Sequence, residues 1–108
     1  MNRKNKEEIH MTISKTLNGS ALTLALEGRL DTVTAPELER ELNASLNGAD
    51  SLTLDFEKLE YISSAGLRVL LSAHKVMSGK GGMKITNVNE IVSEVFEVTG
   101  FCDILEIE

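Results

Sequence analysis

Two adjacent serines, Ser63 and Ser64, are the residues of this chain best placed to do chemistry. They stand between an apolar, strand-like run and a helical pattern, so we expect them at a helix N-terminus. A helix start offers free backbone N–H groups and the positive end of the helix dipole, which together favour an anion. A serine there can cap the helix or accept a phosphate. From the residues alone both roles stay open for Ser64, and Ser63 competes for the cap.

Ser64 lacks the partners that would make it the nucleophile of a hydrolase. The chain has two histidines, and His74 lies ten residues beyond Ser64. Along an intact helix that separation is about 15 Å, outside hydrogen-bond reach. Nothing in the sequence brings His10 to Ser64, and no G-x-S-x-G motif is present. The sequence therefore predicts that the chain is not itself an enzyme.

The sequence also predicts no metal site and no cofactor. Its acidic residues are scattered, without His or Cys at the spacing of metal ligands. Glycines 79, 81 and 82 follow a helical pattern, whereas phosphate-cradling glycines precede a helix, so we expect an ordinary turn. Cys102 is the single cysteine. It can form no internal disulfide, and we expect it to fill a small buried space.

Composition indicates one globular domain without a nucleic-acid or membrane role. The chain has 108 residues, of which 42% are hydrophobic and 26% charged. A formal net charge of −6 opposes binding to phosphate backbones. No apolar run approaches the roughly 20 residues that span a bilayer, and no secretion signal is evident, so we expect a cytoplasmic protein. Residues 1–8 are predicted to be a flexible charged tail, and residues 9–108 the domain.

Hydrophobic periodicity predicts the element order β-β-α-β-α-β-α-β. Alternating apolar residues from Ile9 to Leu26, interrupted at Asn18–Gly19, predict an antiparallel hairpin. Further strands are expected near residues 52–56, 83–86 and 104–107, and helices near 34–46, 64–78 and 89–99. Strands separated by helices pair in parallel through right-handed crossovers, so we expect an α/β fold with a mixed sheet and helices packed against it.

Local signals mark where the helices begin and where the chain only connects elements. Thr34 and Glu37 form a T-x-x-E capping box, and Pro36 suits the first turn. Asn89 is predicted to cap the last helix and Gly100 to end it. Residues 28–33 and 57–60 are predicted to be connections outside the strands.

Two separated motifs resemble the STAS domain family, and within it the SpoIIAA-like bacterial anti-sigma factor antagonists. Gly28-Arg29-Leu30-Asp31 with Thr34-Ala35 resembles the family's G-x-L-D…T-A segment. The run from Leu54 through Ile62-Ser63-Ser64-Ala65-Gly66-Leu67 resembles its strand, linker and D-S-[SA]-G-L helix start. The phosphoacceptor serine of the family falls on Ser64. Ser63 departs from the usual Asp, and its own modification is the alternative.

The resemblance implies a partner-switching cycle. The unphosphorylated antagonist binds an anti-sigma factor that is also a serine kinase, and a sigma factor is released. The kinase phosphorylates the antagonist at the position of Ser64, binding is lost, and a PP2C-type phosphatase restores the first state. STAS domains also serve as non-switching subunits of stress-signalling scaffolds or membrane-transport systems, which is the alternative function.

The surface expected to meet the kinase combines two connections that follow neighbouring strands. It comprises Asp31, Thr32 and Thr34 from the first connection and Ser63, Ser64, Ala65, Gly66 and Arg68 from the second. Asp31 has an equally weighted alternative as a turn residue, because aspartate favours turns.

Overall fold

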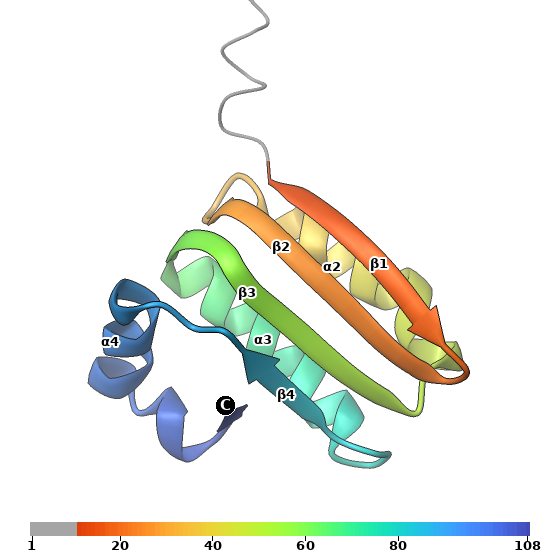
Figure 1. Cartoon of the computed structure of the whole chain (residues 1–108). Helices are drawn as coiled ribbons and strands as arrows, with labels where there is room; N and C mark the ends of the chain where they lie inside the picture. Colours follow the sequence, from red (N-terminus) through yellow and green to blue (C-terminus); the bar gives the residue numbers. More distant parts are fainter. Residues whose placement is uncertain (1–10) are drawn as a thin grey trace, which may run out of the picture.

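The computed structural model describes residues 11–108 as one sheet with helices packed against it (Figure 1). The predicted tail, residues 1–8, and the predicted strand start at residues 9 and 10 lie outside the described range. In chain order the elements are β1 (Thr12–Asn18), β2 (Ala21–Leu30), α2 (Ala35–Ser45), the 3-10 helix η1 (Leu46–Gly48), β3 (Ser51–Ile62), α3 (Ser64–Met77), β4 (Met83–Thr86), α4 (Glu90–Thr99), the 3-10 helix η2 (Phe101–Asp103) and β5 (Glu106–Ile107).

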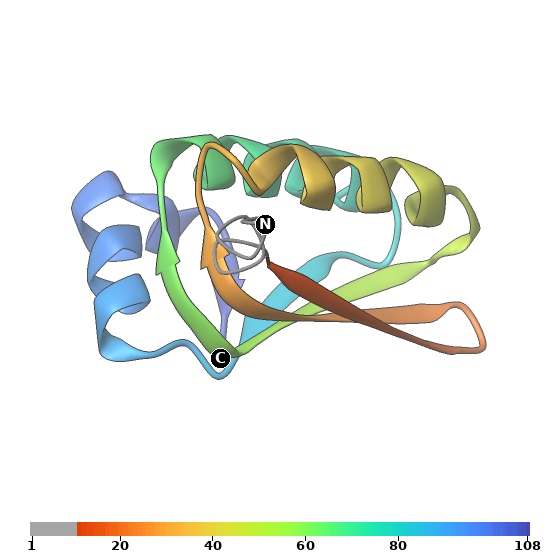
Figure 2. The ribbon, with the colours of Figure 1, turned by 90° about the horizontal axis from the view of Figure 1, so that it is seen from above.

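The five strands lie in the order β1-β2-β3-β4-β5, and the predicted mixed α/β fold is confirmed. β1 pairs antiparallel with β2, and every later pair is parallel. Viewed along the sheet, α2 and α3 lie side by side over one face (Figure 2). This arrangement carries the start of each helix to the same end of the sheet, beside the ends of β2 and β3.

The core fills the space between this face of the sheet and the helices. On β2 the alternate residues Leu22, Leu24 and Leu26 are buried, which is the period-2 pattern of a strand with one covered face. β3 supplies Leu52, Leu54 and Phe56 in the same way. No helix among residues 11–108 is both long and apolar enough to cross a membrane.

The predicted connections at residues 28–33 and 57–60 are partly wrong, because β2 and β3 run through them. β2 continues to Leu30, and β3 continues without a break to Ile62. Between the pairs Ala25↔Asp55 and Glu27↔Lys58, β3 advances three residues while β2 advances two, and a second shift follows at Gly28/Arg29. Such bulges bend a strand and change which residues face the core. The bend turns the end of β3 toward the helices (Figure 2).

Of the C-terminal elements, α4 packs against the second half of β3 and β5 pairs with β4. The Phe96 ring stacks on Phe56 with 6.4 Å between centroids. Asn89 caps α4 as predicted, since its side chain accepts from the Val92 amide at 2.8 Å, and Gly100 ends the helix in a left-handed conformation. The expectation for Cys102 is wrong: its side chain is exposed, because in η2 it is the neighbouring Phe101 that packs against the core.

Candidate functional site

The site begins where β2 and β3 end side by side. The Ser63 amide donates to the Leu30 carbonyl at 2.9 Å, which ties the last residue before α3 to the last residue of β2. The loop that follows β2 and the helix that follows β3 therefore start next to each other, at the carboxyl ends of the two strands. The loop 31–34 and the first turn of α3 face the same end of the molecule (Figure 2).

Ser63 and Ser64 occupy different positions, which the sequence left open. Ser63 is the N-cap residue with extended backbone, and Ser64 is the first residue of α3. The Ser63 side-chain oxygen is buried and has no hydrogen-bond partner within residues 11–108. Ser64 is exposed. Ser64 is therefore not the helix cap, and it presents its hydroxyl to solvent.

The first turn of α3 is open to an anion. The Ser63 side chain makes no capping hydrogen bond, so it leaves the amides of the turn unoccupied by a side chain. The first intrahelical bond is made by the Leu67 amide to the Ser63 carbonyl at 3.0 Å. The preceding N–H groups point outward with the positive end of the helix dipole.

Gly66 fixes how closely α3 approaches β2. It is buried, and a Cβ built on it would lie 2.6 Å from Leu30 Cγ and 3.0 Å from Ile62 Cγ1. Both of those side chains are fully buried, so they have little room to retreat. Only a residue without a side chain allows the start of α3 to pack this closely against Leu30 and Ile62. Gly66 therefore positions Ser64 rather than contacting a partner.

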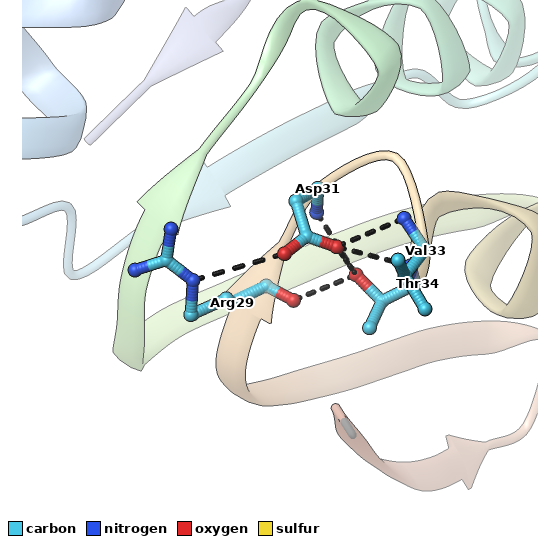
Figure 3. Close-up of polar contacts among 4 residues, drawn as sticks. All are labelled: Arg29, Asp31, Val33 and Thr34. Atoms are coloured by element: carbon cyan, nitrogen blue, oxygen red, sulfur yellow. Dashed lines mark hydrogen bonds and ion pairs between the residues drawn. The ribbon is translucent and has the colours of Figure 1, made fainter. Parts of the chain in front are cut away.

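The loop between β2 and α2 is held by hydrogen bonds from Asp31 (Figure 3). Asp31 Oδ1 accepts from the Val33 amide at 3.0 Å and from the Thr34 amide at 3.1 Å. This is the pattern by which aspartate stabilises its own turn. The turn role of Asp31 is thus confirmed, and one of its two carboxylate oxygens, Oδ1, accepts the hydrogen bonds of the turn.

The second oxygen of Asp31 pairs with Arg29. Arg29 Nε lies 3.7 Å from Asp31 Oδ2, and its guanidinium stacks over the Tyr61 ring at 4.5 Å from the centroid. This stack joins the end of β2 to the end of β3 on the surface. At such exposed positions the ion pair itself contributes little stability, so its effect is to orient the loop.

Thr34 does not form the predicted capping box. It is the N-cap residue of α2, but its helical backbone turns the hydroxyl back into the loop, and no side-chain capping bond forms. Thr34 Oγ1 instead donates to the Arg29 carbonyl at 2.7 Å and accepts from the Asp31 amide at 2.9 Å (Figure 3). Its side chain is completely buried. Thr34 therefore supports the surface from beneath.

We expect Thr34→Val to lower the free energy of unfolding by about 1–3 kcal/mol, because it removes the hydroxyl that bonds two partly buried backbone groups, the Arg29 carbonyl and the Asp31 amide. Thr32→Val is the matched control: Thr32 is exposed and forms no hydrogen bond within residues 11–108, so its change should stay within about 0.5 kcal/mol. Urea denaturation measures both. Equal stabilities of the two variants would contradict this role of Thr34.

A shallow groove runs between α2 and α3 beside Ser64. Its volume is about 300 Å³, and its lining includes Thr32 from the loop, Glu39 from α2, and Ala65 and Arg68 from α3. Arg68 is exposed and forms no ion pair or hydrogen bond within residues 11–108. The groove is therefore lined by the long, positively charged side chain of Arg68 from α3 and by the carboxylate of Glu39 from α2.

α3 is an unbroken helix from Ser64 to Met77, so His74 stays about 15 Å from Ser64 and cannot serve as its base. Residues 11–108 contain no group of three or more His, Cys, Asp and Glu side chains able to hold a metal ion. Within the described chain, the chemistry available at this site is that of an accessible hydroxyl beside an open helix start.

Residues 12–108 match the model of the STAS domain family. The chain belongs to the STAS domain family. Its fold and its two connections at the ends of β2 and β3 are therefore those of a STAS domain.

Two curated STAS relatives are regulators by name. The chain is 39% identical over 88 residues to BtrV of Bordetella bronchiseptica, provisionally named an anti-sigma factor antagonist, with 80% of this chain and 76% of BtrV covered. It is 25% identical over 100 residues to the anti-sigma-B factor antagonist of Bacillus subtilis, with 92% of each chain covered.

Among solved structures, SpoIIAA of Bacillus shares the fold. Its phosphorylated form superposes with a TM-score of 0.70 at 15% identity, covering 90% of this chain and 91% of that chain. The unphosphorylated form of SpoIIAA gives a TM-score of 0.77 at 16% identity, covering 90% and 88%. At this level of identity the likeness concerns the fold alone.

The STAS site contains some predicted surface residues and omits others. Those with exposed or partly exposed positions are Asp31, Thr32, Ser63, Ser64, Ala65 and Arg68, whereas Thr34 and Gly66 are buried. Val33, which sequence reasoning missed, is 59% exposed in the same loop. In the sequence, the only indication of this exposed position is that Val33 is an apolar residue within the predicted connection 28–33. Val33 belongs to the turn held by Asp31, to which its amide donates (Figure 3).

Proposed function

We propose that this STAS domain is an anti-sigma factor antagonist controlled by phosphorylation of Ser64. Its unphosphorylated form binds an anti-sigma factor that is a serine kinase, and a sigma factor is thereby freed in the cytoplasm. Phosphorylation of Ser64 by that kinase ends the binding, and a PP2C-type phosphatase reverses it. The chain itself is a ligand and substrate, and its partners supply the catalysis.

The observation that carries the proposal is the contrast between the two serines. Ser64 exposes a hydroxyl at the open first turn of α3, whereas the Ser63 oxygen is buried. A kinase must bring the γ-phosphate of ATP within bonding distance of the attacking oxygen, so an exposed acceptor is required. The small neighbour Ala65 leaves room for that approach. This contrast favours Ser64 over the alternative target Ser63.

The relatives support the same function. The Bacillus subtilis relative bears the name anti-sigma-B factor antagonist, and the structures of SpoIIAA include a phosphorylated and an unphosphorylated form. Their overlap with this chain covers nearly the whole domain. By inference, this chain antagonises an anti-sigma factor through the surface that surrounds Ser64.

The proposed docking surface consists of exposed and partly exposed residues at the ends of β2 and β3: Asp31, Thr32, Val33, Ser64, Ala65 and Arg68. Val33 is its apolar element, since an exposed apolar side chain on a hydrogen-bonded loop can enter a partner's pocket at little entropic cost. The surrounding charged and polar groups favour correct orientation more than affinity.

A kinase assay tests the proposal. Incubation with the cognate anti-sigma kinase and ATP is expected to add one phosphate, detected as a single mass increase by intact-protein mass spectrometry. Ser64→Ala should abolish the increase, and Ser63→Ala, the matched control, should retain it. Phosphate on Ser63, or none in the wild-type chain, would overturn the proposal. A stable complex with the partner that ATP leaves unchanged would favour the non-switching subunit instead.

A further inference from the structure

We propose that Arg68 receives the phosphate of Ser64 within the same chain, and that this pairing makes its guanidinium unavailable to the partner. The inference rests on the proposed function for its biological setting, because that function supplies the phosphate. The pairing itself depends only on the geometry of α3. Phosphorylation therefore has a second effect on the docking surface: besides adding an anion, it occupies a cation that the partner would otherwise meet.

The two side chains share one face of α3. Arg68 follows Ser64 by four residues within the continuous helix Ser64–Met77. Residues at this spacing are neighbours, with Cβ atoms about 5–6 Å apart. Helical side chains also lean toward the helix N-terminus, so the long side chain of Arg68 can reach back past Ala65 to a phosphate on Ser64.

Nothing described competes strongly for Arg68. It forms no hydrogen bond or ion pair within residues 11–108. Arg29, the other arginine of the site, is held by Asp31 at 3.7 Å and by the Tyr61 ring. Glu39 lines the same groove from α2 without pairing with Arg68. A phosphate carrying about −1.5 to −2 charges, with three acceptor oxygens, is a stronger partner than one carboxylate.

The direction of the pair is also favourable. An anion placed N-terminal to a cation at i, i+4 agrees with the helix dipole, and the reverse order is weaker. A guanidinium can donate two parallel hydrogen bonds to phosphate oxygens. The phosphate would then lie along α3 between its first turn and Arg68 rather than project from the helix end.

Titration of the phosphate tests the pairing. Phosphoserine is installed at position 64 during translation, so no kinase is needed, and its second ionisation is followed by 31P NMR. Because Arg68 favours the dianion, Arg68→Ala is expected to raise the phosphate pKa by about 0.3–1. Arg68→Lys should restore part of the difference. Arg40→Ala, which removes another exposed arginine without a partner within residues 11–108, should leave it unchanged.

A second measurement follows the guanidinium. In the phosphorylated protein the Arg68 Nε–H should exchange with water several-fold more slowly than in the unphosphorylated protein. Equal pKa values in the wild-type and Arg68→Ala phosphoproteins, or equal Nε–H exchange in the two states, would overturn the inference. Neither readout involves a kinase, so a negative kinase assay and an intact pairing can be told apart.

Discussion

Ser64→Asp is expected to weaken binding of this chain to its anti-sigma kinase fivefold to several hundredfold. An added carboxylate about 4 Å from an acidic group of the partner costs on the order of 1 kcal/mol in water and about 4 near a protein surface. Those energies correspond to the stated range of affinities. Isothermal titration calorimetry with the purified kinase measures the change.

The same substitution should leave the fold intact. Ser64 is exposed at the first position of α3, where the helix dipole favours a negative charge. We therefore expect the free energy of unfolding to change by less than about 0.5 kcal/mol. Asn47→Asp is the matched control, because it adds the same charge at an exposed position in η1, beyond the far end of α2. Equal binding by Ser64→Asp and Asn47→Asp would contradict the switch.

The sequence predicts this fold where local patterns decide it. The alternation of Leu52, Leu54 and Phe56 identifies β3, and Asn89 identifies the start of α4. The alternation fails after Phe56, because the next buried residues are Leu59 and Ile62. Their spacing of three reflects bulges that arise from the pairing of β3 with β2, and no local propensity encodes that register.

The division of roles between Ser63 and Ser64 shows the same limit at the site. Both hydroxyl residues suit a helix start, so the sequence predicts the location and the type of chemistry. Which of them is buried depends on where β3 ends. That point is set by the bond from the Ser63 amide to the Leu30 carbonyl, a contact between distant parts of the chain. Val33 was missed for a related reason, since its exposure depends on a turn formed by Asp31.

Gly66→Val is expected to lower the free energy of unfolding by about 3 kcal/mol, at the upper end of the usual cost of overpacking. Its Cβ would lie 2.6 Å from Leu30 Cγ, and the added methyl groups deepen the overlap. Urea denaturation measures the loss. Gly48→Val is the matched control, because no atom lies within 4 Å of a Cβ at Gly48. Equal stabilities of these variants would show that α3 is not held close to β2.

A second substitution separates overpacking from a general failure to fold. Leu30→Ala alone should cost about 2–5 kcal/mol, because it leaves a cavity beneath α3. In the double variant the side chain introduced by Gly66→Val enters that cavity. The stability lost by the double variant should therefore be smaller than the sum of the two single losses by about 0.5–3 kcal/mol. Additive losses would contradict the close packing of Gly66 on Leu30. If the double variant regains stability but is phosphorylated more slowly than wild type, then the depth at which α3 sits also sets how Ser64 meets the kinase.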